Sequence, residues 1–247
     1  MEAIKISNIV KEYKDVTALK DVSFSVNEGE LFGLLGVNGA GKTTLIKILS
    51  GLTKKTNGEA KILGLDLDND LNEIKKIIDV SPQETSVAPN LTVIENLKFF
   101  ANIYDKYDEA YLKKVIDVFD LNEVVNKPVK KLSGGYQRRV SIACALISKP
   151  KVLFLDEPTL GLDVISRREL WRIILKLKGK ITIILTTHYL EEIEALCDRI
   201  LIMSKGNVLA IGTSDEIKKN ADAVTLEDAF VKIVEEKANE KNIDLFE

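Results

Sequence analysis

The sequence predicts an α/β fold with a parallel-sheet core, an antiparallel β subdomain and an inserted α-helical subdomain. Continuous apolar runs at 31–35, 151–155 and 181–185 are typical of parallel strands that are covered on both faces. Residues 22–26 alternate between apolar and polar side chains, which is the period of a half-buried antiparallel strand. Residues 91–149 follow helical spacing instead, so we expect a helical subdomain inserted into the α/β core before the strand at 151–155.

Composition limits the classes of protein that fit. The 247 residues carry a net charge of −3, with 35 Lys and Arg against 38 Asp and Glu, which argues against a nucleic-acid-binding surface. Cys144 and Cys197 lie far apart and outside metal-ligand spacing, so we expect two reduced, buried thiols. We expect no signal peptide, and no apolar run approaches the roughly 20 residues that span a bilayer. Any membrane-spanning part would therefore belong to another chain.

The first third of the chain is predicted to be mostly β-structure. Residues 3–36 have strand patterns, and Asn27-Glu28-Gly29-Glu30 forms a turn that leads into the run 31–35. We interpret Tyr13 as part of a polar stretch that precedes the strand at 22–26. Two further short apolar runs, at 59–64 and 76–81, are predicted as strands.

A glycine-rich segment follows the buried run 31–35 and precedes a breaker-free run that begins a helix. Its residues are Gly36, Val37, Asn38, Gly39, Ala40, Gly41, Lys42, Thr43 and Thr44. Glycines let the backbone approach a ligand, while successive N–H groups and the helix N-terminus favour an anion. We expect Lys42 to contact the β- and γ-phosphates of a nucleotide and the Thr43 hydroxyl to bind Mg²⁺. A loop that merely turns the chain would not need the complete spacing, so we predict a P-loop NTPase (RecA-like) core.

The helical block has recognisable starting points. Thr92 and Glu95 fit a capping box, and a second helix is expected near 109–119. Ser133 is predicted to be the N-cap of a third helix. Before this block, Pro82 ends the strand at 76–81 and leaves Gln83 on a loop.

Two carboxylates end the run 151–155. Asp156 and Glu157 are therefore predicted at the carboxyl end of the sheet, where open α/β sheets bind ligands. Asp156 can hold the metal ion, and Glu157 can act as general base toward the attacking water. Towards the C-terminus we expect a hairpin of 199–204 and 207–211 and an amphipathic helix from Thr225 onward.

The motifs together resemble the ATP-binding subunit of the ABC transporter family, nearly end to end. Leu132-Ser133-Gly134-Gly135 is similar to the family signature, and Leu160-Gly161-Leu162-Asp163 is similar to its D-loop. Gln83 matches the glutamine loop and His188, the only histidine, matches the switch histidine. Tyr13 matches the aromatic residue that stacks on adenine.

The resemblance implies roles for these residues. Gln83 would help coordinate Mg²⁺ and water, and His188 would bond the γ-phosphate and orient Glu157. Ser133, with Gly134 and Gly135, would bind the γ-phosphate of an ATP held by the opposite subunit. The resemblance therefore implies a Mg²⁺-dependent ATPase that works as a head-to-tail dimer, either a homodimer or a heterodimer with a similar ATPase. Its further partner would be an integral membrane permease, which places the chain at the cytoplasmic face of the cell membrane.

We expect residues 1–220 to form the ABC ATPase domain, with the helical subdomain at about 84–149 inserted, and 221–247 to form a C-terminal helix and tail. Two residues depart from the family pattern. Tyr136 stands where glutamine is most frequent, and Val37 replaces a common proline in the phosphate loop. Neither change removes a predicted catalytic group.

The stretches 187–192 and 225–230 resemble exporter-type members, whose membrane partners move substrates outward. Two other interpretations remain: a soluble ABC ATPase that acts on ribosomes or DNA, and a nucleotide-binding regulatory module without turnover. The absence of a basic tail disfavours the first, and the presence of Glu157 and His188 disfavours the second. By resemblance, a groove near Gln83 and the segment 84–90 should receive a short helix of the membrane subunit.

Overall fold

A six-stranded sheet forms the centre of the protein in the computed structural model, which describes residues 1–242. Its strand order is β10-β9-β3-β8-β7-β6, and all neighbours are parallel except the antiparallel hairpin of β9 and β10. The strands are β3 (Leu31–Leu35), β6 (Ile78–Ser81), β7 (Val152–Asp156), β8 (Thr182–Thr187), β9 (Arg199–Ser204) and β10 (Asn207–Gly212). The buried runs at 31–35, 151–155 and 181–185 are thus confirmed as parallel strands, and the terminal hairpin is confirmed as well.

A second, four-stranded antiparallel sheet has the order β2-β1-β4-β5. Its strands are β1 (Glu2–Tyr13), β2 (Val16–Asn27), β4 (Asn57–Ile62) and β5 (Leu65–Asp66). Helix α1 (Lys42–Leu49) shares one hydrophobic core with this sheet and with one face of the six-stranded sheet. Tyr13 is the last residue of β1 and precedes β2, the strand that contains residues 22–26.

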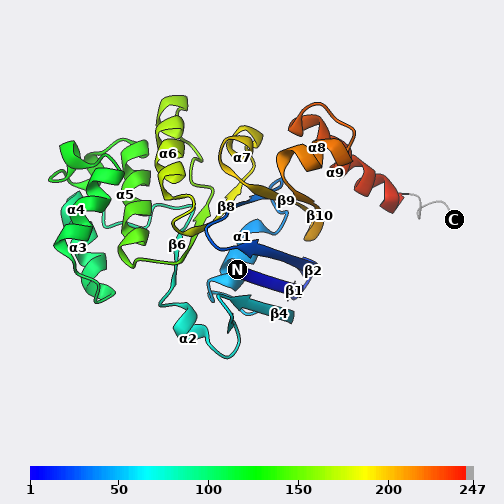
Figure 1. The fold of residues 1–247 in the computed structure, drawn as a ribbon, viewed down its shortest axis with the longest axis horizontal. Coiled ribbons are helices and arrows are strands. Elements are labelled where there is room, and N and C mark those ends of the chain that lie inside the picture. Colours follow the sequence, from blue (N-terminus) through cyan, green and yellow to red (C-terminus); the bar gives the residue numbers. More distant parts are fainter. Residues whose placement is uncertain (243–247) are drawn as a thin grey trace.

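The helices between β6 and β7 form a lobe at one end of the molecule (Figure 1). They are α3 (Val93–Ile103), α4 (Glu109–Val118) and α5 (Gly134–Ile147), with short 3₁₀ turns at Asn122–Val124 and Val129–Lys131. The capping box predicted at Thr92 and Glu95 is present, and Ser133 is the N-cap of α5. Leu97, Leu112 and Val140 are among the apolar side chains that join this lobe to the core on the other face of the six-stranded sheet.

Helices α6 (Val164–Leu177) and α7 (Leu190–Leu196) follow β7 and β8 and cover the same face of the sheet as the lobe. Helix α2 (Leu71–Ile74) is a single turn before β6. The chain then ends with α8 (Ser214–Asn220) and α9 (Leu226–Asn242), which lie at the opposite end of the molecule from the lobe (Figure 1). The predicted helix from Thr225 onward is therefore confirmed as far as Asn242, and residues 243–247 of the predicted helix and tail lie outside the described residues.

None of the helices within 1–242 combines the length and the apolar character that a bilayer span requires.

Candidate functional site

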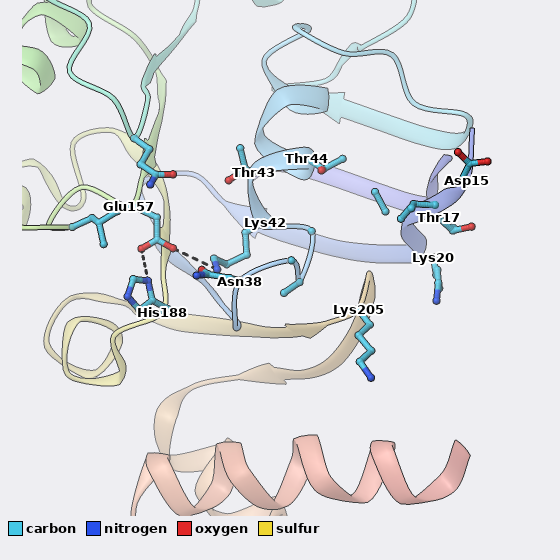
Figure 2. A pocket seen from close by; sticks show the side chains of 17 residues that line it. Asp15, Thr17, Lys20, Asn38, Lys42, Thr43, Thr44, Glu157, His188 and Lys205 are labelled. Carbon is cyan, nitrogen blue, oxygen red and sulfur yellow. Dashed lines mark hydrogen bonds and ion pairs between the residues drawn. The ribbon is translucent and has the colours of Figure 1, made fainter. Parts of the chain in front are cut away.

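A cavity of about 820 Å³ opens at the carboxyl ends of β3, β7 and β8. This volume lies in the usual range for a small-molecule site, about 300–1,000 Å³. Figure 2 shows Lys42, Glu157 and His188 pointing toward one another on one side of it, with Asp15, Lys20 and Lys205 on the other. The lining residues are Asp15, Val16, Thr17, Ala18, Lys20, Asn38, Gly39, Ala40, Gly41, Lys42, Thr43, Thr44, Gln83, Glu157, Leu160, His188 and Lys205.

The glycine-rich loop follows β3 directly and ends as the N-cap of α1. Gly41 has φ = 107°, and a Cβ there would lie 2.7 Å from Leu19 Cδ2 and 2.9 Å from the Ala18 carbonyl oxygen, so only glycine fits. Among the described residues, Ala40 N–H donates to the Val37 carbonyl, but no group accepts from the amides of Gly39 or Gly41. These amides and the first turn of α1 are therefore available to an anion.

Lys42 is 6% exposed and turns back over the loop. Its Nζ donates to the Gly36 carbonyl oxygen at 2.6 Å and lies 3.4 Å from Glu157 Oε1. A phosphate group that entered the loop would offer Lys42 a stronger, charged acceptor in place of a backbone carbonyl.

Glu157 lies between a lysine and a histidine. Its Oε2 is 2.9 Å from His188 Nδ1, on the side opposite the contact with Lys42 (Figure 2). Glu157 has φ = 48°, an unfavourable conformation for a non-glycine residue, and its amide donates to Thr186 Oγ1 and to the Thr186 carbonyl. The backbone is thus held so that a 7% exposed carboxylate faces the cavity. A carboxylate in this position can accept a proton from a water molecule in the cavity.

Thr43 and Asp156 are the residues that could hold a magnesium ion. Thr43 Oγ1 is 3.4 Å from Asp156 Oδ1, which also accepts from Thr186 Oγ1 at 2.5 Å. Within the described part of the chain, no group of three or more His, Cys, Asp or Glu side chains could hold a metal ion. One hydroxyl and one carboxylate nevertheless fit Mg²⁺, which keeps several waters and is usually completed by substrate phosphates.

Arg138, on α5, connects the edge of the cavity to the helical lobe. Its guanidinium donates to the carbonyl oxygens of Asp156 (2.8 Å), Pro158 (2.8 Å), Pro82 (2.6 Å) and Gln83 (3.2 Å). Burial lowers the pKa of Arg138 to about 10, which leaves it charged at neutral pH. The loop that carries Gln83 is therefore tied to the loop after β7 through a side chain that the sequence analysis did not single out.

The signature residues are not brought to this cavity. Ser133 Oγ accepts from the Tyr136 amide of its own helix at 3.5 Å, and neither Ser133, Gly134 nor Gly135 lines the cavity. A Cβ on Gly134 would meet only Leu162 Cδ2, at 3.9 Å, whereas a Cβ on Gly135 would lie 2.7 Å from Ser166 Oγ. The signature therefore packs closely against α6 at Gly135 and leaves space around Gly134.

Tyr13 is also outside the lining. It is 47% exposed at the end of β1, and the Lys11 ammonium lies 4.6 Å from its ring centroid. The turn that follows Tyr13 supplies Asp15 and Val16 to the cavity, so the ring lies two residues from the rim.

Several lining residues were missed from the sequence. Thr17 and Lys20 come from β2, and Lys205 comes from the tight turn between β9 and β10. The turn is held beside the phosphate loop because the Gly206 amide donates to the Ala40 carbonyl at 3.0 Å. The Lys205-Gly206 turn was visible in the sequence, but nothing local indicated which loop it would contact.

A second cavity, of about 240 Å³, lies between β6 and the helices α3 and α5. Leu52, Phe100 and Tyr104 give it apolar walls, and Pro82 and Ser86 place it beside the Gln83 loop. Burial raises the pKa of the Asp79 carboxyl in this cavity, and burial together with Asp79 raises the pKa of Tyr104. The cavity therefore combines aromatic surface with one carboxyl group.

Comparison with known proteins gives a consistent result. Residues 19–160 match the sequence profile of a family described as "ABC transporter". The chain is 36% identical over 240 residues to the "Probable multidrug ABC transporter ATP-binding protein YbhF" of Escherichia coli. The matched region covers 94% of this chain but only 41% of the length of YbhF. It is 40% identical over 238 residues to the "Doxorubicin resistance ATP-binding protein DrrA" of Mycobacterium tuberculosis, covering 94% of this chain and 70% of DrrA.

Solved structures show the same architecture. An "ATP binding subunit of ABC transporter" superposes with a TM-score of 0.83 at 29% identity and covers 94% of this chain and 99% of its own. The ADP conformation of MJ1267, "an ATP-binding cassette of an ABC transporter", gives a TM-score of 0.82 at 28% identity, with 95% and 98% covered. The predicted P-loop NTPase class, with an antiparallel sheet and added helices, is confirmed.

Proposed function

Because this chain belongs to the ABC transporter family as an ATP-binding subunit, we propose that it hydrolyses ATP at the interface of a head-to-tail dimer and powers export through a separate membrane protein. The observation that carries the proposal is the Glu157 carboxylate, which lies between Lys42 and His188 at the edge of a cavity lined by the phosphate loop. A phosphate-binding loop, a base and a histidine in one cavity are the groups that phosphoryl transfer to water requires.

The residues divide the reaction between them. The loop from Gly36 to Thr44 would hold the phosphates through backbone amides, and Lys42 would move from Glu157 to the β- and γ-phosphates. Glu157 would take the proton of the attacking water, while His188 would orient that carboxylate and bond the γ-phosphate. Thr43, Asp156 and the side chain of Gln83 would hold Mg²⁺, which adds positive charge beside the phosphates.

The site needs a second subunit. Ser133, Gly134 and Gly135 lie outside the cavity, although their helix offers a free N-terminus to an anion. In a head-to-tail dimer, of two copies or with a similar ATPase, this N-terminus would face the γ-phosphate bound by the partner. ATP would then close two composite sites, and hydrolysis would open them.

The membrane partner would bind beside Gln83. The cavity of about 240 Å³ lies next to the predicted docking segment 84–90, and its aromatic walls suit an apolar side chain from a short helix. This arrangement would keep the chain at the cytoplasmic face of the membrane as a peripheral subunit. The names of YbhF and DrrA mention multidrug transport and doxorubicin resistance, which favours export over import. The ribosome or DNA alternative finds no support among these relatives.

Purified protein, with and without Mg²⁺, provides the test. We expect wild-type ATP hydrolysis to require Mg²⁺, and Glu157→Gln to lower kcat about 100- to 1,000-fold while ATP still binds. Glu157→Gln should also accumulate an ATP-bound dimer in size-exclusion chromatography, because the ligand that closes the sites is not consumed. Lys42→Ala should form no such dimer.

A Glu157→Gln variant that turns over at the wild-type rate would remove Glu157 as the base. An ATP-induced dimer of Lys42→Ala would contradict the phosphate site as described. Co-purification from gently solubilised cells tests the partner separately: a polytopic membrane protein at matched stoichiometry is expected, and ribosomes or DNA without one would contradict the transport proposal.

A further inference from the structure

One carboxylate that the mechanism above does not use is fully buried beside the site. Glu192 is 0% exposed on α7. Its Oε2 accepts a hydrogen bond from Thr159 Oγ1 at 3.0 Å, and its Oε1 accepts from Trp171 Nε1 at 3.1 Å. A buried carboxylate costs several kcal/mol in desolvation unless donors satisfy it. A role beyond packing would account for a charged group where an apolar side chain could fill the space.

The partners of Glu192 connect the two loops that carry the reacting groups. Thr159 follows Glu157 by two residues, and Glu192 follows His188 by four residues. Glu157 and His188 meet in the cavity at 2.9 Å, whereas Thr159 and Glu192 join the same two segments in the protein interior. The segments are therefore connected at two places, one exposed to ligand and one enclosed.

The buried hydrogen bond between Thr159 and Glu192 helps to hold the backbone of Glu157, which is in an unfavourable conformation. Glu157 has φ = 48°, and the amide of Leu160, the residue after Thr159, donates a hydrogen bond to the Glu157 carbonyl oxygen at 3.2 Å. Arg138 fixes the intervening Pro158 through its carbonyl. If Thr159 were released, one of the contacts that hold this tight turn, and with it the direction of the Glu157 carboxylate, would be lost.

Both side-chain oxygens of Glu192 act as hydrogen-bond acceptors in this connection. Thr159 and Trp171 both donate, and an ionised carboxylate accepts at each oxygen, whereas an amide at this position would present one donor. The pKa of the Glu192 carboxyl is raised, chiefly by burial and also by the negative charge of Glu157, while the side chains of Thr187, Thr159 and Trp171 oppose the rise by hydrogen bonding to the carboxylate.

We propose that Glu192 is a positioning residue for hydrolysis, which holds the Glu157 loop against the His188 loop through Thr159 and connects both to α6 through Trp171. This inference rests on the proposed ATPase function. It assigns to Glu192 an effect on turnover but not on ATP affinity, because neither Glu192 nor Thr159 lines the cavity that would hold the nucleotide.

Steady-state kinetics of four variants test the proposal. We expect Glu192→Gln and Thr159→Val each to lower kcat about tenfold, as for a modest misplacement of the base, with KM for ATP within twofold of wild type. Since both substitutions break one connection, the double variant should be no slower than either single variant. Glu191→Gln is the matched control: this neighbouring residue is exposed, bonds only Arg167 at 3.3 Å among the described residues, and should leave kcat unchanged.

Fluorescence gives a readout that a loss of folded protein would not mimic. Trp171 is the only tryptophan, its indole N–H bonds Glu192, and the Arg167 guanidinium lies 5.5 Å from its ring centroid. Addition of Mg²⁺ and a non-hydrolysable ATP analogue should change the emission of the wild type. The change should disappear in Glu192→Gln, although calorimetry still detects binding of the analogue.

The outcomes separate this inference from the proposed function. A wild type that neither binds nor hydrolyses ATP would overturn the proposed function itself. A wild type that hydrolyses ATP beside a Glu192→Gln variant with unchanged kcat, or with an unchanged emission response, would overturn only the positioning role. Additive losses in the double variant would likewise show that Glu192 and Thr159 act separately.

Discussion

The phosphate loop and the signature differ in how completely this chain prepares them. On the phosphate-loop side, Lys42 is 6% exposed and already contacts Gly36 and Glu157. On the signature side, the Ser133 hydroxyl contacts only its own helix among the described residues, and there is open space around Gly134. One half of the proposed site is thus organised before ligand arrives, and the other half presents an N-terminus with nothing of its own to bind. In the proposed dimer, the phosphate loop of this chain would bind the nucleotide first, and the signature of the partner would then complete the site.

A charge placed on the signature is the most direct way to break this comparison, and a large effect is expected. Gly134→Asp has room for its side chain, because the added Cβ would meet only Leu162 at 3.9 Å. The new carboxylate would repel the γ-phosphate of the partner's ATP, so we expect hydrolysis to fall about 100-fold, which corresponds to roughly 2.7 kcal/mol. ATP binding to the monomer, measured by calorimetry, should change less than threefold.

Asn126→Asp provides the control for that variant, since it adds the same charge at an exposed position of the helical lobe. Its hydrolysis rate should equal that of the wild type. A Gly134→Asp variant with normal turnover would mean that the signature does not face the nucleotide, and the contrast between the two halves would lose its functional meaning.

A substitution of Arg138 tests how strongly the signature helix α5 is joined to the loops at the edge of the phosphate-loop cavity. Arg138→Met removes hydrogen bonds to the carbonyl oxygens of Gln83, Asp156 and their neighbours and leaves buried acceptors unsatisfied. We expect the free energy of unfolding in urea to fall by about 2–4 kcal/mol. Arg168→Met, on the exposed face of α6, should change it by less than about 0.5 kcal/mol. Equal stabilities of the two variants would show that the guanidinium contributes no net connection.

The smallest expected effect concerns Tyr13, which the family resemblance places on adenine and which the structure places outside the cavity lining, two residues before Asp15. If its ring stacks on the base, Tyr13→Ala should weaken ATP binding about 5- to 30-fold, the equivalent of about 1–2 kcal/mol. Tyr107→Ala removes a comparably exposed ring from the helical lobe and should leave the affinity unchanged. Equal affinities of wild type and Tyr13→Ala would exclude stacking by this ring.

Much of the fold could be predicted because local physics and tertiary structure agree in this chain. Buried parallel strands, the Thr92 capping box and the Ser133 N-cap all follow from short sequence patterns. The strand predicted at 59–64 ends at Ile62 because Leu63 and Gly64 both adopt positive φ, at 49° and 82°. Because an apolar leucine continues a strand pattern, this turn could not be predicted from the pattern alone.

The parts of the site that escaped prediction depend on long-range contacts. Arg138, Lys205 and Glu192 each act, or are placed, through residues more than ten positions away in the chain. A buried arginine or glutamate looks like a surface charge until the fold supplies its partners. The phosphate loop and the two acids at the end of β7 were accessible from sequence because each is a short contiguous motif that follows a buried strand.

The contact between Lys42 and Glu157 has a consequence for the timing of the reaction. While the loop holds no phosphate, the carboxylate that would activate water is engaged by a lysine 3.4 Å away. Arrival of the nucleotide would draw that lysine to the phosphates, and the same event would free the base. In the proposed mechanism, the base would therefore become available only after the phosphates of the substrate are in place.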